Sequence, residues 1–244
     1  MLSEAMAWQW GMVTAAQAER LGLSRSDLAD FVAGGHLVQV LDDVYMGASV
    51  PTSEFDELRA TWLSTDPATF ADDRPNSGNG SVVVAGESAA ALHRIGDYWA
   101  STHEFVSPEN RESQHSRIRF RARNLEPNDV TLVEGLPVMT LERTIADLVE
   151  GFGDLRHVAN ALRDASGKRP IDENRLVTLL EPLAQLDNYP HQDGQALLET
   201  LKFWAGIDAK SVARRIADDS ILAPLLFDLI VDSKREESVS YARS

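Results

Sequence analysis

The spacing of apolar residues predicts three short helices near the start of the chain. Leu2, Met6 and Trp10 share one face at 3.6 residues per turn, which predicts a helix over the first ten residues. Two more helices are expected at about 15–21 and 24–33, the latter ending before a pair of glycines. This stretch is therefore interpreted as a small helical unit.

Each of the second and third helices opens with a capping signature. Thr14 precedes Gln17 by three residues, and Ser24 precedes Asp27 by the same distance, which is the spacing of a capping box. Beyond the third helix, apolar segments flank a Leu-Asp-Asp turn at 41–43 and predict a β-hairpin. Three helices followed by a hairpin are typical of a winged helix-turn-helix.

The rest of the chain predicts a connecting helix, a linker and a larger second unit. A helix is expected at 53–64 and a linker rich in Pro, Gly, Asp, Asn and Ser at about 65–80. Strands and helices then alternate, and the helices after residue 153 are expected at 154–165, 172–185, 194–205, 209–218 and 221–232. The predicted fold class is α+β, with a winged helix-turn-helix domain at 1–50, a connecting helix and linker at 51–80, and an α/β domain with a helical C-terminal part at 81–244.

One predicted strand, SRIRFRARN at 116–124, alternates strictly between apolar and cationic residues. Ile118, Phe120 and Ala122 fall on one face and arginines on the other. The cationic cluster around this strand consists of Arg111, His115, Arg117, Arg119, Arg121 and Arg123. Its period-2 arginines repeat every ~6.6–7 Å, roughly the phosphate spacing along one DNA strand. Two interpretations carry equal weight: a DNA-binding face, or an outer face whose arginines pair with carboxylates elsewhere.

Charge decides how much each surface can attract DNA. The chain carries a net charge of −15, and phosphate neutralisation needs Lys and Arg. Residues 1–75 hold four Lys and Arg against twelve Asp and Glu, a net charge of −8, whereas residues 76–125 hold six against five. The positive charge that a DNA complex requires is therefore expected from the cationic strand.

In a helix-turn-helix, the first residues of the second helix read base edges in the major groove. The pattern turns Leu28, Phe31 and Val32 inward and leaves the N-terminal part of the helix exposed, where an arginine can pair with guanine. The predicted DNA-binding residues of this unit are Thr14, Gln17, Arg20, Ser24, Arg25 and Ser26. The alternative is that both helices are only capped and packed, as in winged helices that bind proteins.

Sequence patterns of enzymes are missing from the chain. There are no cysteines, no metal-ligand spacing of histidines, no phosphate-binding loop and no Gly-x-Ser-x-Gly motif. Acid-x-Lys steps of the nuclease type occur only at 208–210 and 232–234, both in helical context. We therefore expect no catalysis, no cofactor and no metal. Without a long apolar run or a signal segment, we also expect no membrane association and a cytoplasmic location.

Residues 11–47, GMVTAAQAERLGLSRSDLADFVAGGHLVQVLDDVYMG, resemble the N-terminal winged helix of AbiEi-type antitoxins of type IV AbiE toxin–antitoxin systems. SAAALHRIGDY at 88–98 and GLPVMTLERTIADLVEG at 135–151 resemble the second domain of that family. The resemblance covers about half of the chain. Family members tend to have a basic second helix, and this sequence departs from that pattern at Asp27 and Asp30.

The resemblance implies a transcriptional autorepressor that binds operator DNA upstream of its own operon. It also implies that the protein counteracts a nucleotidyltransferase toxin, with or without direct contact. If the strand arginines supply the positive charge, DNA binding should be steeply salt-dependent and lost when Arg117, Arg119, Arg121 and Arg123 become alanine. The alternative is an antitoxin that binds the toxin protein directly through its acidic surface, with little DNA binding.

Overall fold

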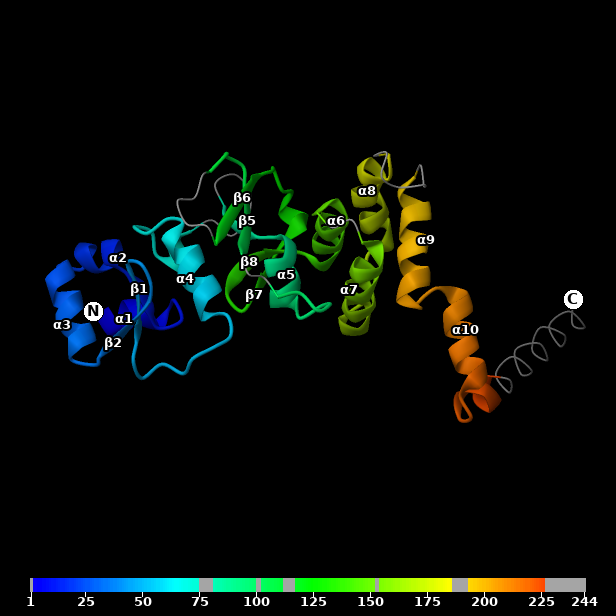
Figure 1. Cartoon of the computed structure of the whole chain (residues 1–244), viewed down its shortest axis with the longest axis horizontal. Coiled ribbons are helices and arrows are strands. Elements are labelled where there is room, and N and C mark those ends of the chain that lie inside the picture. The colour runs from blue at the N-terminus through cyan, green and yellow to red at the C-terminus, as the bar shows by residue number, and fades with distance from the viewer. Residues whose placement is uncertain are drawn as a thin grey trace, which may run out of the picture.

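The computed structural model describes residues 2–74, 81–99, 102–111, 117–151, 154–185 and 193–226. It shows a mixed α+β fold with two sheets, which confirms the predicted class at that level. The molecule is elongated, with α1–α3 at one end and α10 at the other (Figure 1).

The first sheet gathers the N-terminal elements. These are α1 (Leu2–Ala7), β1 (Met12–Thr14), α2 (Ala15–Arg20), α3 (Arg25–Ala33), β2 (Leu37–Leu41) and β3 (Val44–Gly47). The strand order is β1-β3-β2, and both pairings are antiparallel. The two capping boxes form as predicted, with the Thr14 hydroxyl accepting from the Gln17 amide and the Ser24 hydroxyl from the Asp27 amide. Strand β1 was not predicted, because three buried residues are too few to show a period.

Trp10 does not lie on the first helix as predicted. Helix α1 ends at Ala7, and Trp10 adopts a φ of 58° that turns the chain toward β1. Its indole nitrogen donates to the carbonyl of Glu134 at 2.9 Å, and its ring meets Trp62 edge to face at 6.0 Å. Trp10 therefore joins the N-terminal unit to a turn more than a hundred residues further along.

Helix α4 (Asp56–Ser64) lies between the two sheets (Figure 1). All six residues from 58 to 63 are buried, because the helix has neighbours on both sides. One apolar cluster joins Met12 and Met46 of the first sheet to Trp62 of α4 and to Phe105 and Val138 of the second sheet. The core is thus continuous from one sheet to the other.

Residues 65–74, which belong to the predicted linker, pack against the rest of the structure. Arg74 is buried and donates to the carbonyls of Trp62 and Leu63 at 2.6 Å, and to that of Asp66. Burial lowers the pKa of Arg74 to about 10. A short 3-10 helix, η1 (Ala71–Asp73), follows the same path. Residues 75–80 of the predicted linker lie outside the described residues.

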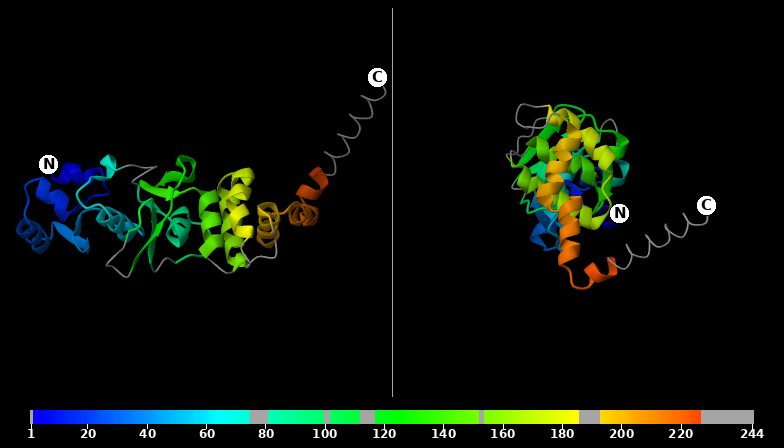
Figure 2. Two further views of the ribbon diagram at one scale, coloured as in Figure 1. Left: turned by 90° about the horizontal axis from the view of Figure 1, so that it is seen from above. Right: turned by 90° about the vertical axis from the view of Figure 1, so that its right-hand side faces the viewer.

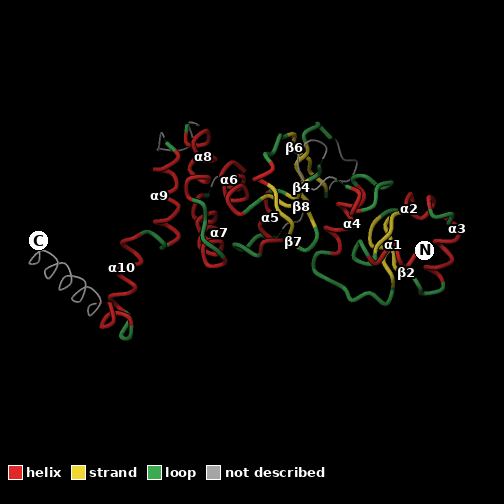
Figure 3. The backbone as a smooth tube through the Cα atoms, turned by 180° about the vertical axis from the view of Figure 1, so that it is seen from behind, coloured by secondary structure: helices red, strands yellow, loops and turns green. Residues whose placement is uncertain are grey.

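The second sheet has five strands in the order β6-β5-β4-β8-β7. Its elements are β4 (Val83–Val84), α5 (Gly86–His93), β5 (His103–Ser107), β6 (Ile118–Ala122), η2 (Pro127–Asp129), β7 (Val130–Val133), β8 (Leu136–Met139) and α6 (Leu141–Gly151). Strands β5 and β6 run parallel, as do β4 and β8, while the other two pairs are antiparallel. The sheet lies between α4 and α6 (Figure 3). Ile118 and Phe120 of β6 pack on the apolar cluster that includes α4, whereas Arg121 bonds Asp147 of α6. Strand β7 was not predicted.

The C-terminal helices are α7 (Leu155–Lys168), α8 (Glu173–Ala184), α9 (Gly194–Ala205) and α10 (Ala209–Asp218). The four corresponding predicted spans are confirmed to within a few residues. The fifth, at 221–232, lies partly outside the described residues, and within it residues 222–226 are helical. Helices α6–α9 share one apolar core, whereas α10 has no buried residue and projects from the body (Figure 2). None of the described helices has both the length and the apolar character needed to cross a bilayer.

Candidate nucleic-acid interface

Helix α3 presents an open face at the N-terminal end of the molecule (Figure 1). Leu28 is its one fully buried residue, because a single turn of the helix rests on the apolar cluster below it. The exposed side chains at 26, 29, 30 and 33 are small or acidic and share one face at helical spacing. Val32, which was predicted to face inward, is 36% exposed. The helix therefore offers a smooth surface that a groove or another helix could approach closely.

Arg25 does not stand free on this surface. Its guanidinium is held bidentately by Asp43 in the β2–β3 turn, with the Nη2–Oδ2 contact at 2.9 Å. The hydrogen bond and charge of Asp43 raise the pKa of Arg25, and the same hydrogen bond lowers that of Asp43. Asp27 is likewise engaged, since hydrogen bonds from Ser24 lower its pKa. These carboxylates thus fasten the hairpin to α3 and cap the helix.

Thr14 and Gln17 were predicted to contact phosphate, and their burial contradicts this. Both are fully buried. The Thr14 hydroxyl donates to the carbonyl of Pro67, and the side-chain amide of Gln17 donates to the carbonyl of Thr69 at 2.9 Å. The segment at 65–74 covers them, so neither side chain reaches the surface.

The remaining cations of the N-terminal unit are also engaged. Arg20 donates to the carbonyl of Ala68 and lies over the ring of Phe70, with 5.8 Å from its guanidinium carbon to the ring centroid. Arg59 pairs with Glu134 at 3.0 Å. Within the described residues up to 74, every arginine therefore has a partner, and the surface of this unit is dominated by carboxylates.

The four arginines of the cationic strand each pair with a carboxylate. Arg117 bonds Glu57 of α4 at 2.9 Å, and Arg119 bonds Glu104 of β5 at 3.1 Å. Arg121 and Arg123 bond carboxylates of α6. All four arginines therefore pair with carboxylates, as the second interpretation expects, while the side chains of Arg117 and Arg119 stay 73% and 65% exposed. DNA binding by this strand stays a prediction.

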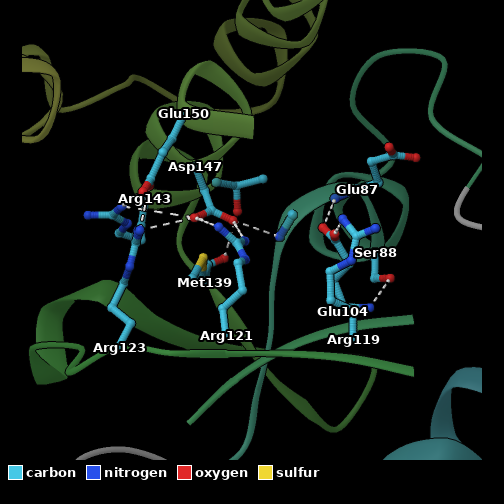
Figure 4. Close-up of polar contacts among 12 residues, drawn as sticks. Glu87, Ser88, Glu104, Arg119, Arg121, Arg123, Met139, Arg143, Asp147 and Glu150 are labelled. Carbon is cyan, nitrogen blue, oxygen red and sulfur yellow. Dashed lines mark hydrogen bonds and ion pairs between the residues drawn. The ribbon is translucent and has the colours of Figure 1, made fainter. Parts of the chain in front are cut away.

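Asp147 is the centre of this pairing (Figure 4). Its side chain is fully buried and accepts from both Nη atoms of Arg121, one at 2.9 Å, and from Arg123 at 3.1 Å. It also accepts from the amide of Gly86 at 2.9 Å. Arg123 reaches Glu150 as well. The network ties β6 and the start of α5 to helix α6.

The environment of the network shifts the pKa values of Arg121 and Arg143 in opposite directions. Burial opposes the charge of Arg121, but the hydrogen bonds and charge of Asp147 outweigh it and raise the pKa of Arg121. Burial and the neighbouring charge of Arg123 lower the pKa of Arg143, which lies 3.8 Å from Glu150. A cavity of about 110 Å³ remains beside Gly86, which is below the ~300–1,000 Å³ of typical ligand sites. The network therefore has the features of a structural clamp.

The last two predicted residues are placed differently. Arg111 donates to the carbonyl of Thr65 at 3.1 Å, in the segment that leaves α4. His115 lies outside the described residues. Among the described residues, no group of three or more His, Asp or Glu side chains is arranged to hold a metal ion.

Sequence reasoning missed Asp147 as a binding partner of the strand. Its signal was an acid within the apolar run Thr-Ile-Ala-Asp-Leu-Val, where a buried carboxylate requires a cation. The alternating arginines were the matching set. Nothing in the local sequence indicates that the two segments meet.

Comparison with known proteins gives evidence on the fold alone. No family model matches the chain, and no curated protein matches it. A solved structure, the crystal structure of RV2827C protein from Mycobacterium tuberculosis, is similar with a TM-score of 0.50 and 19% sequence identity. The match covers 81% of this chain and 79% of that chain.

Proposed function

We propose that the chain is an antitoxin and DNA-binding transcriptional autorepressor that counteracts a nucleotidyltransferase toxin. In this proposal residues 1–50 form a winged helix-turn-helix whose helix α3 enters the major groove of operator DNA upstream of its own operon. The observation that carries it is the open, capped face of α3 beside the β2–β3 hairpin at one end of the molecule. The resemblance of residues 11–47 to AbiEi-type antitoxins supports the same conclusion.

The contacts expected in such a complex follow from the charges. Ser26 is exposed and can bond a phosphate or a base edge, whereas the hydroxyl of Ser24 already donates to Asp27. Arg25 must exchange Asp43 for DNA, because it is the one arginine on α3. Because few cations are available, the affinity for DNA should depend only weakly on salt concentration. Each phosphate contact contributes about 0.9 to the slope of log K against log salt. This replaces the steep dependence that a free cationic strand would give.

Fluorescence anisotropy with the DNA upstream of the gene, against scrambled DNA of equal length, tests the proposal. Ala29→Glu and Ala33→Glu each place a carboxylate on the open face of α3, where a groove would lie. Ala217→Glu adds the same charge on exposed α10 and serves as the control. We expect both α3 variants to lose selective binding and the control to keep it. Equal effects of all three variants, or no selective binding by the parent chain, would contradict the proposal.

A second candidate function is direct binding of the toxin protein. It is favoured by one observation, the pairing of every arginine in the described residues up to 74 within an acidic unit. Such a surface repels phosphate and attracts a basic protein. Co-purification of the full chain with a neighbouring nucleotidyltransferase at moderate salt would support this function, and separation of the two proteins would contradict it.

A further inference from the structure

A cavity of about 300 Å³ opens on the N-terminal unit between α1 and η1. Its walls are mainly apolar and include Trp8, Leu21 and Phe70. Trp8 is 74% exposed, so its ring can contact a ligand at the opening of the cavity. The volume is at the lower end of the ~300–1,000 Å³ range of ligand sites, which suits one side chain better than a cofactor.

Two carboxylates complete the cavity. Asp72 and Asp73 line it and are exposed. Unlike Asp27 and Asp43, whose carboxylates bond neighbouring groups, these two have no ion pair or side-chain hydrogen bond within the described residues. Their charge is therefore available to an incoming group.

The aromatic wall already receives one cation from the same chain. The guanidinium of Arg20 lies over Phe70 at 5.8 Å from the ring centroid, within the range of cation–π attraction. Trp8 has the ring type that binds cations best, and no cation lies over it among the described residues. An open tryptophan, together with two carboxylates that form no ion pair among the described residues, matches a cationic side chain.

The charge of the surrounding unit points the same way. Residues 1–75 carry a net charge of −8, and all four of their arginines are engaged with partners in the fold. A basic segment would be attracted over the whole unit and held where aromatic and acidic groups converge.

We propose that this cavity receives a Lys or Arg side chain from a basic segment of a partner protein. The proposal rests on the second candidate function, in which the unit binds protein, and it holds whether or not α3 binds DNA. The cation would lie over Trp8 with its charge beside Asp72 and Asp73.

The test uses the full chain and a fluorescein-labelled peptide of alternating Arg and Ser, with a Glu-Ser peptide as the acidic comparison. We expect the Arg-Ser peptide alone to bind, and Asp72→Asn/Asp73→Asn to weaken it about tenfold, in line with a partly buried cation site. Trp8→Ala should weaken it to a similar degree. Glu109→Gln/Asp218→Asn removes the same charge from exposed positions elsewhere and should change the affinity by less than about threefold.

Three outcomes of the peptide assay would overturn the proposal. They are no binding of the Arg-Ser peptide at low salt, equal losses in the site variant and the charge-matched control, and unchanged affinity of Trp8→Ala. Circular dichroism of each variant checks that the fold is kept. If the site variants still co-purify with the toxin, the cavity proposal fails while the second candidate function stands. If no toxin co-purifies but the peptide binds as described, the cavity binds cations and its partner is another basic protein.

Discussion

Replacement of Asp147 by asparagine should destabilise the protein more than any comparable change at the surface. The carboxylate is fully buried and accepts four hydrogen bonds, from both Nη atoms of Arg121, from Arg123 and from the amide of Gly86. Asparagine keeps the shape but has one acceptor oxygen and no charge, so two cations lose their counter-ion. Removing one partner of a buried pair costs about 3–5 kcal/mol.

The structure places the expected loss at the low end of that range. Arg121 and Arg123 remain 28% and 22% exposed, and Glu150 still accepts from Arg123. We therefore expect a loss of about 3 kcal/mol, which for a chain of this size lowers Tm by about 6–12 °C. Thermal and urea unfolding followed by circular dichroism measure both quantities.

Two controls separate the buried charge from a general effect of substitution. Glu150→Gln removes a half-exposed partner of Arg123 and should cost at most about 1 kcal/mol. Arg121→Gln combined with Asp147→Asn removes both charges of the main pair and should recover part of the loss. A loss below about 1 kcal/mol in Asp147→Asn would refute the reasoning, because the carboxylate would then not be holding the arginines.

Three further predictions concern other parts of the structure. Asp43→Asn frees the arginine that it binds and should steepen the dependence of operator affinity on salt by about 0.9 in log K per log salt; an unchanged slope in the anisotropy titration would contradict this. Burial lowers the pKa of His93 below its usual 6.5. The unfolded chain therefore binds a proton at His93 more readily than the folded chain does. The stability that neutral His93 contributes is complete above pH 6.5 and is lost as the pH falls toward the lowered pKa. Urea unfolding should therefore show that the free energy of unfolding falls less between pH 7.5 and pH 5.5 in His93→Gln than in the parent chain. Gly86→Ala should lose about 1–3 kcal/mol, because Gly86 has a φ of 54° and a Cβ would overlap the carboxylate of Glu104; Gly22→Ala, with a positive φ but open space, should lose less in the same unfolding assay.

Features set by neighbouring residues could be predicted from the sequence. The capping boxes at Thr14 and Ser24 depend on contacts over three residues, and both form. The alternation of the strand at 118–122 depends on backbone geometry alone, and Ile118 and Phe120 pack on the core as expected, although Ala122 is exposed. The long helices after residue 153 carry clear apolar periods, and they too were found.

Features set by distant residues could not be predicted in this way. Thr14 and Gln17 are buried by a segment about fifty residues away, whose polar composition resembles that of a linker. Arg121 and Arg123 are neutralised by a helix that lies more than twenty residues further along the chain. The local sequence pattern shows which face of a helix or strand carries these side chains. It does not show which residues they contact in the folded chain.

The placement of α4 between the sheets has a consequence for cooperativity. Because one apolar cluster runs from Met12 through Trp62 to Val138, a cut after residue 50 would expose apolar surface on both fragments. In the intact chain, the backbone amides of β3 and β8 should therefore exchange with solvent in one common opening event. DNA or protein bound at the N-terminal end would slow that exchange in the second sheet as well. Binding at the N-terminal end could therefore be measured from the protection of amides in the second sheet against hydrogen exchange.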